Sequence, residues 1–237
     1  MRSICSGLPY INDSSSWIDS FLATFLEEPT CTNYGWGPVQ TYPSYMEIIR
    51  QDAPSNAVYF LKSGNIKLTW ADQEGHEVIA GLRHQNWLIG APSVLLEKPY
   101  SFTITTLTQC SLRCISAQKF LHLVNANTDF SLHLMKILSQ EIFNHAKTLV
   151  TLGCVPVRDR LKYLLYKFTS EMSTKKRNDK YIKISLPLKY KEIAQILAVT
   201  PEYLSRILKE METRKEIRRQ KDGSIELNTE SLRSLHI

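Results

Sequence analysis

The sequence predicts an α+β protein in three parts: a jelly-roll-like β-barrel, one long helix, and a small C-terminal unit of helices and a hairpin. From about residue 39 to 116, short apolar runs alternate with turn residues, as in strands. From 128 to 153, apolar residues recur at steps of three and four, as in a helix. The charge also changes: residues 155–237 hold 19 Lys and Arg against 11 Asp and Glu, whereas 1–154 hold 10 against 12. Only the basic C-terminal part is expected to meet a polyanion.

The composition is that of a globular protein, with 43% hydrophobic and 22% charged residues in a chain of 237. The N-terminus lacks an apolar signal core, and no apolar run approaches the roughly 18 residues that a bilayer requires. We therefore expect a cytoplasmic protein without a membrane partner. Five cysteines, with no C-x-x-C pair, argue against a disulfide framework and against a metal site. Burial is the expected state of Cys110 and Cys114, which share one face of a strand.

The barrel begins after a short amphipathic helix, which serine caps predict at residues 14–28. Two strand-length runs follow between residues 57 and 82, and Gly64 ends the first of them. The segment Asp72–Gly75 separates the arms of a hairpin. Residues 101–116 then alternate again, rich in Thr. Several short strands at close spacing are typical of a small β-barrel or sandwich.

The long helix carries one apolar seam. Its predicted members, at alternating steps of three and four, are Met135, Leu138, Ile142, His145, Leu149 and Leu152. A seam of this kind, sustained for more than two heptads, favours pairing with the same helix of a second copy. The alternative is that the stripe packs back on its own barrel. We expect a homodimer whose seam contains Met135, Leu138, Ile142 and Leu149.

The C-terminal unit contains a helix-turn-helix pattern. A hinge at 153–159 leads to a helix, a polar loop and a short strand at 181–188. Apolar residues then fall at the offsets that lock two helices together across a turn: Ile193, Leu197, Val199, Leu204 and Ile207. Thr200 suits the N-cap and Pro201 the first helical position. One departure is Ala198, where the turn often has glycine, so we expect slight strain there.

The second helix leaves four polar residues, Glu202, Ser205, Arg206 and Lys209, opposite its apolar face. Arginine can bind guanine through two hydrogen bonds, glutamate can accept from cytosine, and serine is adaptable. We expect Glu202, Ser205 and Arg206 to read bases in double-stranded DNA. A hairpin around Asp222-Gly223 follows and reads as a wing. The expected contacts to the DNA backbone are Thr200, Lys209, Arg218, Arg219 and Lys221.

Over residues 17–230 the chain resembles the Crp/Fnr family of bacterial transcription regulators. The most specific segments are VYFLKSGNIKLTWADQEGHEVIAGL, NWLIG and KEIAQILAVTPEYLSRILKEME. Glu202, Ser205 and Arg206 match the E-x-x-S-R pattern of Fnr-type recognition helices, which implies a TTGA-like half-site. The resemblance implies a sensory β-roll of the cyclic-nucleotide-binding type with its N-terminal helix at 1–127, a dimerisation helix at 128–153 and a winged helix-turn-helix at 154–237. It also implies RNA polymerase as a partner, although no motif marks the contact surface.

The sensory end departs from the family pattern. Cyclic-AMP binders have G-E-x-(A/G)-L followed by R-S or R-T. Here Gly90 and Ser101 are retained, but Ala91 stands at the glutamate position and Tyr100 at the arginine position. A cyclic-nucleotide phosphate would lose its bidentate partner, so cyclic AMP is not expected. We expect either another small-molecule effector near Trp87, Tyr100 and the long helix, or no effector, or a response to thiol oxidation.

No cofactor is identified. Cys5 and Cys31 alone cannot form the cluster of Fnr, and the spacing of His76, His84 and His122 selects none of them as a haem ligand. No P-loop, G-x-S-x-G or H-E-x-x-H pattern is present, so an enzyme is not expected. The sequence thus predicts a regulator that binds an inverted repeat as a homodimer. Two alternatives remain: a β-roll regulatory subunit of an enzyme, and an architectural DNA-binding protein without an effector.

Overall fold

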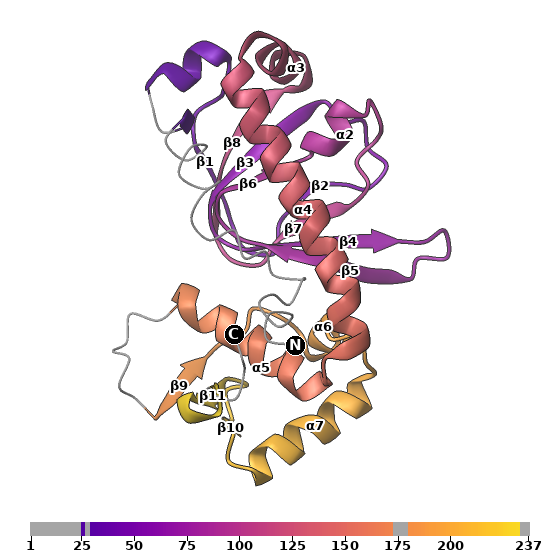
Figure 1. The fold of residues 1–237 in the computed structure, drawn as a ribbon, viewed down its shortest axis with the longest axis vertical. Coiled ribbons are helices and arrows are strands. Elements are labelled where there is room, and N and C mark those ends of the chain that lie inside the picture. The colour runs from indigo at the N-terminus through magenta and orange to yellow at the C-terminus, as the bar shows by residue number, and fades with distance from the viewer. Residues whose placement is uncertain (1–24, 27–28, 173–179, 233–237) are drawn as a thin grey trace. The chain divides into compact units, whose positions relative to one another are not determined.

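The computed structural model describes residues 25–26, 29–172 and 180–232. The helix expected at 14–28 lies outside these residues, except for Phe25 and Leu26, which are helical. The described chain forms two compact units, and the boundary between them falls after Asn144. That boundary lies within the long helix α4, Thr128–Cys154 (Figure 1). Among the described residues, no helix is long and apolar enough to cross a membrane.

The first unit is built on two four-stranded antiparallel sheets. One has the order β1-β8-β3-β6, and the other has the order β2-β7-β4-β5. The strands are β1 Gln40–Tyr42, β2 Glu47–Ile49, β3 Ala57–Ser63, β4 Ile66–Ala71, β5 Glu77–Arg83, β6 Trp87–Ile89, β7 Thr103–Thr106 and β8 Cys110–Ser116. The hairpin expected around Asp72–Gly75 joins β4 to β5. Gly64, with φ of +97°, lies in the turn between β3 and β4.

The two faces of the β1-β8-β3-β6 sheet are covered by different partners. One face packs against the other sheet, where Leu61 and Leu112 meet Ile104 in a buried core. On the opposite face, Phe60 of β3 belongs to a second buried core that includes Phe120 and Phe130. These phenylalanines come from α3, Ala117–Ala126, and from α4. The alternation of buried residues along β3 and β8 therefore serves two cores, one with the other sheet and one with helices.

The long helix α4 buries one stripe and exposes another. Leu134 and Ile137 are buried, whereas Met135, Ile142 and Leu149 are 55%, 72% and 74% exposed. Leu138 differs from the expectation, because it is half-buried and packs against the core formed with α3. The exposed stripe instead continues at Leu132, Ser139, Ala146 and Gly153. These positions repeat every seven residues, in step with Met135, Ile142 and Leu149.

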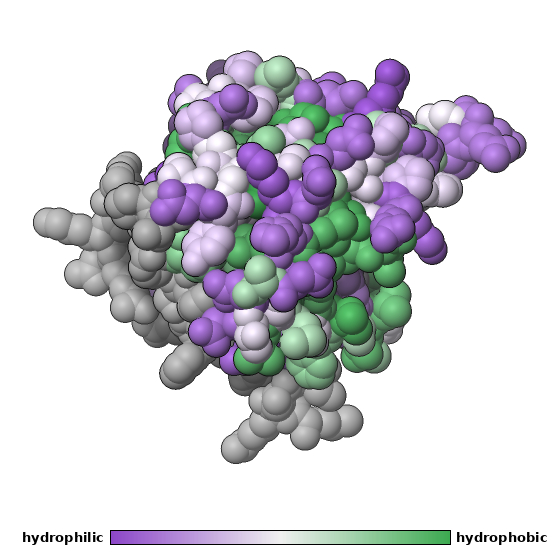
Figure 2. All heavy atoms as spheres, turned by 90° about the horizontal axis from the view of Figure 1, so that it is seen from above, coloured by the Kyte–Doolittle hydropathy of each residue, from purple (hydrophilic) through white to green (hydrophobic). Residues whose placement is uncertain are grey.

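Figure 2 shows the hydropathy of the residues on one face of the molecule. The projection at the right, formed by the turn between β4 and β5, is hydrophilic, and apolar residues gather below the centre of the view. The turn residues from Gln73 to Glu77 are exposed. Two exposed apolar side chains of α4, Phe143 and Val150, lie outside the stripe. The apolar surface of α4 is thus wider than a single row.

The second unit combines helices with a three-stranded antiparallel sheet of order β10-β11-β9. Its elements after α4 are α5 Val157–Met172, β9 Tyr181–Ile184, α6 Tyr190–Ile196, α7 Pro201–Thr213, β10 Ile217–Arg219 and β11 Ile225–Asn228. β9 ends four residues before the predicted strand end, and Leu186 and Leu188 follow it outside the sheet. The α+β class, with an N-terminal β-sheet domain, a long helix and a C-terminal helix-turn-helix, is confirmed.

Candidate nucleic-acid interface

A tight turn joins α6 to α7. Ala198 adopts the left-handed region, with φ of +51°, and its N–H donates to Gln195 O at 2.9 Å. A residue with a Cβ pays roughly 1–2 kcal/mol in this conformation, which is the strain expected from the missing glycine. Thr200 then caps α7, because its Oγ accepts from Tyr203 N at 3.2 Å. Pro201 occupies the first helical position, as predicted.

The two faces of α7 separate as the spacing predicted. The buried residues are Leu204, Ile207, Leu208 and Met211. The exposed set contains Glu202, Ser205, Arg206 and Lys209. The core therefore fixes the rotation of α7 about its axis, and the four polar side chains that were expected to meet DNA share one solvent-facing side.

Helix α5 supports this pair of helices through two buried cations that sequence reasoning missed. Arg160 Nη1 donates to Leu197 O, at the end of α6, at 2.8 Å. Lys162 Nζ lies 2.9 Å from Glu216 Oε1, in the segment between α7 and β10. Both bonds reach across more than thirty residues of sequence, so no local pattern reveals them. They connect α5 to the end of α6 and to the segment that follows α7.

Two of the predicted base-reading residues are held on the surface of α7. Hydrogen bonds from its own backbone N–H and from the Thr200 hydroxyl keep the pKa of Glu202 below its usual value. The guanidinium carbon of Arg206 lies 4.7 Å from the ring centroid of Tyr203. Tyr203 was not among the predicted site residues. The signal was present, because residues three apart on a helix are neighbours.

The wing carries cations in three different environments. Arg219 Nη2 lies 2.7 Å from Glu212 Oε2, and this bond lowers the pKa of the Glu212 carboxyl. Arg218 stacks over the ring of Tyr181 at 3.9 Å. Lys221 is exposed in the loop between β10 and β11. This loop spans Gln220 to Ser224, with Gly223 at φ of +81°, so the hairpin is wider than a two-residue turn.

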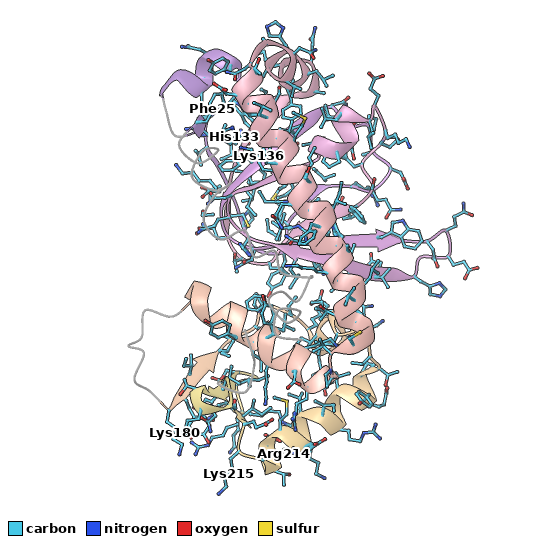
Figure 3. The ribbon with its side chains drawn as sticks, viewed as in Figure 1. Phe25, His133, Lys136, Lys180, Arg214 and Lys215 are labelled. Atoms are coloured by element: carbon cyan, nitrogen blue, oxygen red, sulfur yellow. The ribbon has the colours of Figure 1, made fainter. Side chains whose placement is uncertain are left out.

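The end of α7 adds further basic groups. Figure 3 shows Arg214 and Lys215 at the point where α7 gives way to the wing. Arg214 Nη2 pairs with Glu210 Oε1 at 2.8 Å, one turn earlier on the same helix. Lys215 takes the left-handed region with φ of +59° and ends the helix. The described second unit thus presents cations from α7, its C-terminal end and the wing.

At the expected effector site, Tyr100 is buried and packs against Gly90. Tyr100 is 7% exposed, and its hydroxyl donates to Ala57 O at 2.6 Å. Gly90 has φ of +83°, and a Cβ there would lie 2.7 Å from Tyr100 Cε1. Ala91 is buried in the core with α3, whereas Ser101 is exposed. The two residues that replace the phosphate-binding pair thus belong to two different buried cores, and Tyr100 packs over the retained glycine.

A buried ion pair links the barrel to α4. Arg83, at the end of β5, is 6% exposed, and its Nε lies 3.5 Å from Glu141 Oε1 without hydrogen-bond geometry. Trp87 Nε1 donates to the same carboxylate oxygen, and the guanidinium lies 4.9 Å from the Trp87 ring centroid. Burial lowers the pKa of Arg83, and Glu141 partly opposes this shift. Trp87, expected to contact an effector, instead contacts this pair.

The cysteines of the barrel are poor candidates for a thiolate. Cys110 is buried and Cys114 is half-buried, and burial raises the pKa of both thiols. Cys31 is buried and accepts from Arg113 Nη1 at 2.8 Å. Cys5 lies outside the described residues. A raised pKa leaves less thiolate at neutral pH, which disfavours oxidation of Cys110 and Cys114.

Two family models match the chain. Residues 39–127 match the cyclic nucleotide-binding domain, and residues 159–235 match the Crp-like helix-turn-helix domain. The cAMP-activated global transcriptional regulator CRP of Salmonella typhimurium is 24% identical over 175 residues, which are 73% of this chain and 82% of that protein. The Haemophilus influenzae protein of the same name is 22% identical over 172 residues, 72% of this chain and 75% of its own.

Solved structures show the same fold. FixK2 from Bradyrhizobium japonicum superimposes with a TM-score of 0.68 at 18% identity, covering 84% of this chain and 96% of its own. A transcriptional regulator of the CRP/FNR family from Thermus thermophilus gives 0.69 at 15% identity, covering 84% and 98%.

Proposed function

The chain belongs to the Crp/Fnr family of transcription regulators, and from this premise we propose that it binds an inverted-repeat operator as a homodimer. The observation that carries the proposal is the recognition helix α7. Its buried face fixes its rotation, Thr200 caps its start, and Glu202, Ser205 and Arg206 remain exposed on one side. Such a helix can enter a major groove with its first turns against base edges.

Dimerisation is supported by the surface of α4. Met135, Ile142 and Leu149 repeat every seven residues and are more than half exposed. Smaller residues, Ser139, Ala146 and Gly153, lie between them and would allow two helices to approach closely. Covering this row is favourable, because full burial of each large apolar side chain contributes about 1.5–3 kcal/mol of free energy. The partner we propose is α4 of a second copy.

The chemistry of α7 suggests the half-site. Arg206 would bind guanine through O6 and N7, and Glu202, one turn earlier, would accept from cytosine N4. Ser205 would lie near a thymine. These assignments fit a TTGA-like half-site. The contacts to phosphates would come from Thr200, Lys209, Arg218, Arg219 and Lys221. Arg219 is also bound to Glu212, so its guanidinium would contact both the carboxylate and a phosphate.

The β-roll would not be controlled by a cyclic nucleotide. Tyr100 packs where the family has an arginine, and no cation replaces the phosphate partner at Ala91 or Tyr100. The effector would be another small molecule, or the protein would act without one. In this division residues 1–127 form the sensory domain, 128–153 the dimerisation helix and 154–237 the DNA-binding domain, and RNA polymerase is the further partner.

Selection from a pool of random duplexes tests this function. We expect an inverted repeat whose half-site centres lie about 10 base pairs apart, one turn of the double helix. Binding to all duplexes alike would instead support an architectural protein. An absence of any DNA binding, with a bound enzyme recovered from host extract, would support a regulatory subunit.

A further inference from the structure

Tyr203 lies on the flank of α7, between its buried face and its polar face. It is half-buried, and its backbone N–H donates to the Thr200 hydroxyl at 3.2 Å. Tyr203 therefore lies in the first turn of α7, which the Thr200 cap holds in place. The guanidinium of Arg206, one turn later, lies over its ring with the carbon 4.7 Å from the centroid. Arg206 is otherwise exposed, so this ring is the main surface that restrains it.

We propose that Tyr203 is a positioning residue for base recognition, whose ring holds the Arg206 guanidinium in the orientation in which it meets guanine. This inference rests on the proposed function, because it assigns Arg206 to a base. It adds a residue outside the E-x-x-S-R positions. Tyr203 acts through Arg206 and needs no contact with a base of its own.

The two interactions of Arg206 are compatible because they use different parts of the guanidinium. Stacking on an aromatic ring uses the face of the planar group. Hydrogen bonding to guanine O6 and N7 uses the N–H donors at its edge, and these lie in the plane. Arg206 can therefore stay stacked on Tyr203 while it binds guanine. A restrained side chain also loses less rotamer freedom on binding.

The wing offers a matched control, since a second arginine stacks on a tyrosine there. Arg218 lies over the Tyr181 ring at 3.9 Å, and Tyr181 Oη donates to Lys215 O at 3.2 Å. Arg218 is proposed to meet phosphate, which carries no sequence information. Loss of the Tyr181 ring should therefore leave the base preference unchanged, whereas loss of the Tyr203 ring should weaken it.

The test compares Tyr203→Phe, Tyr203→Leu and Tyr181→Leu with the natural protein. Affinity is measured for the selected operator and for the same duplex with the guanine of each half-site replaced by adenine. Tyr203→Leu should reduce the preference for guanine by about two- to fivefold per half-site, the value of an exposed cation–π contact. Tyr203→Phe keeps the ring and should retain the full preference. Tyr181→Leu should weaken both duplexes equally.

A second readout needs no DNA. The nitrogen and proton resonances of the Arg206 guanidinium should carry a ring-current shift that persists in Tyr203→Phe and disappears in Tyr203→Leu. Loss of that shift without any change in guanine preference would overturn the positioning role and leave the proposed function intact. A stronger preference in Tyr203→Leu would also overturn it, since the stack would then hold Arg206 away from its base. If the natural protein selected no inverted repeat, both would fall.

Discussion

The β-roll departs from the family pattern at its phosphate-binding positions, whereas the recognition helix α7 keeps the family pattern at its base-reading positions. In the β-roll, the positions that would hold a phosphate are filled: Tyr100 is buried over Gly90, and its hydroxyl is satisfied by Ala57 O. On α7, the positions that would read bases are open, with Arg206 and Glu202 exposed. The first region makes its hydrogen bonds within the protein, whereas the second still presents polar groups to a partner.

This difference shows which partners a polar side chain needs in each region. A buried polar group needs a hydrogen-bond partner inside the protein. The Tyr100 hydroxyl, at the position where the family has an arginine, has its partner in Ala57 O. A base-reading residue needs no internal partner, because water satisfies it until DNA arrives. Glu202 and Arg206 nevertheless have weak local contacts, with the Thr200 hydroxyl and the Tyr203 ring. These contacts orient the two side chains, and both side chains can still form hydrogen bonds with DNA bases.

The largest effect is expected at Ile142, because the proposed inverted repeat requires two copies of α7 in one dimer. Ile142→Asp would place a charge in the proposed seam and should weaken the dimer by several kcal/mol. Sedimentation at low micromolar concentration should then find monomers, and operator binding should fall with dimerisation. Gln140→Asp, on another side of the helix, is the control and should remain dimeric. A fully dimeric Ile142→Asp would move the interface away from this face.

A substitution at Glu141 tests whether the buried ion pair with Arg83 stabilises the β-roll. Glu141→Gln keeps the size of the side chain but leaves Arg83 buried without a counter-charge, which should destabilise this unit by about 3–5 kcal/mol. Denaturant unfolding followed by tryptophan fluorescence measures the change, since all four tryptophans lie in residues 1–87. Glu74→Gln, which removes an exposed carboxylate 3.6 Å from His76, should cost roughly 0.5 kcal/mol or less. Equal effects of the two variants would contradict the importance of the buried pair.

A substitution at Arg206 tests base reading by the exposed face of α7 directly. Arg206→Ala should cost about 1–3 kcal/mol per half-site and relax the preference for guanine. Fluorescence anisotropy on the selected operator and on guanine-substituted duplexes measures both effects. Lys221→Ala is the control: it should weaken all duplexes alike and lower the slope of log affinity against log salt by about one. If Arg206→Ala still required the guanine, another residue reads that base.

Local sequence patterns predicted the second unit better than the first. The offsets from Ile193 to Ile207 specify two helices and a turn within one short segment, and the missing glycine at Ala198 predicted its left-handed strain. The pair of Arg83 and Glu141 left no such trace, because β5 and α4 are far apart in sequence and meet only after folding. Periodicity likewise placed Leu138 in the seam, but it cannot distinguish a stripe facing its own core from one facing a partner.

The substitution at Tyr100 was predictable in part. The sequence identified the loss of the arginine and thus of a phosphate partner. It could not indicate that the ring would pack over Gly90, because that contact depends on how the segment after α2, Ala91–Leu95, returns to β3. The structure therefore strengthens the expectation about cyclic nucleotides. The site lacks the attractive charge, and a buried side chain occupies its place.

The smallest effect is expected from cyclic AMP and cyclic GMP. A ligand at about 100 times its dissociation constant would raise the unfolding free energy by roughly 2.7 kcal/mol. To bind here, a nucleotide would have to displace the Tyr100 ring, break its bond to Ala57 O, and bury a phosphate with no cation from Ala91 or Tyr100. Millimolar nucleotide should therefore leave both the melting temperature and the operator affinity unchanged. The cAMP-activated regulator of Salmonella typhimurium, measured in parallel, confirms that the assay detects a bound nucleotide. A clear thermal shift in this protein would mean that Tyr100 moves aside, and the contrast between a closed β-roll and an open recognition helix would then fail.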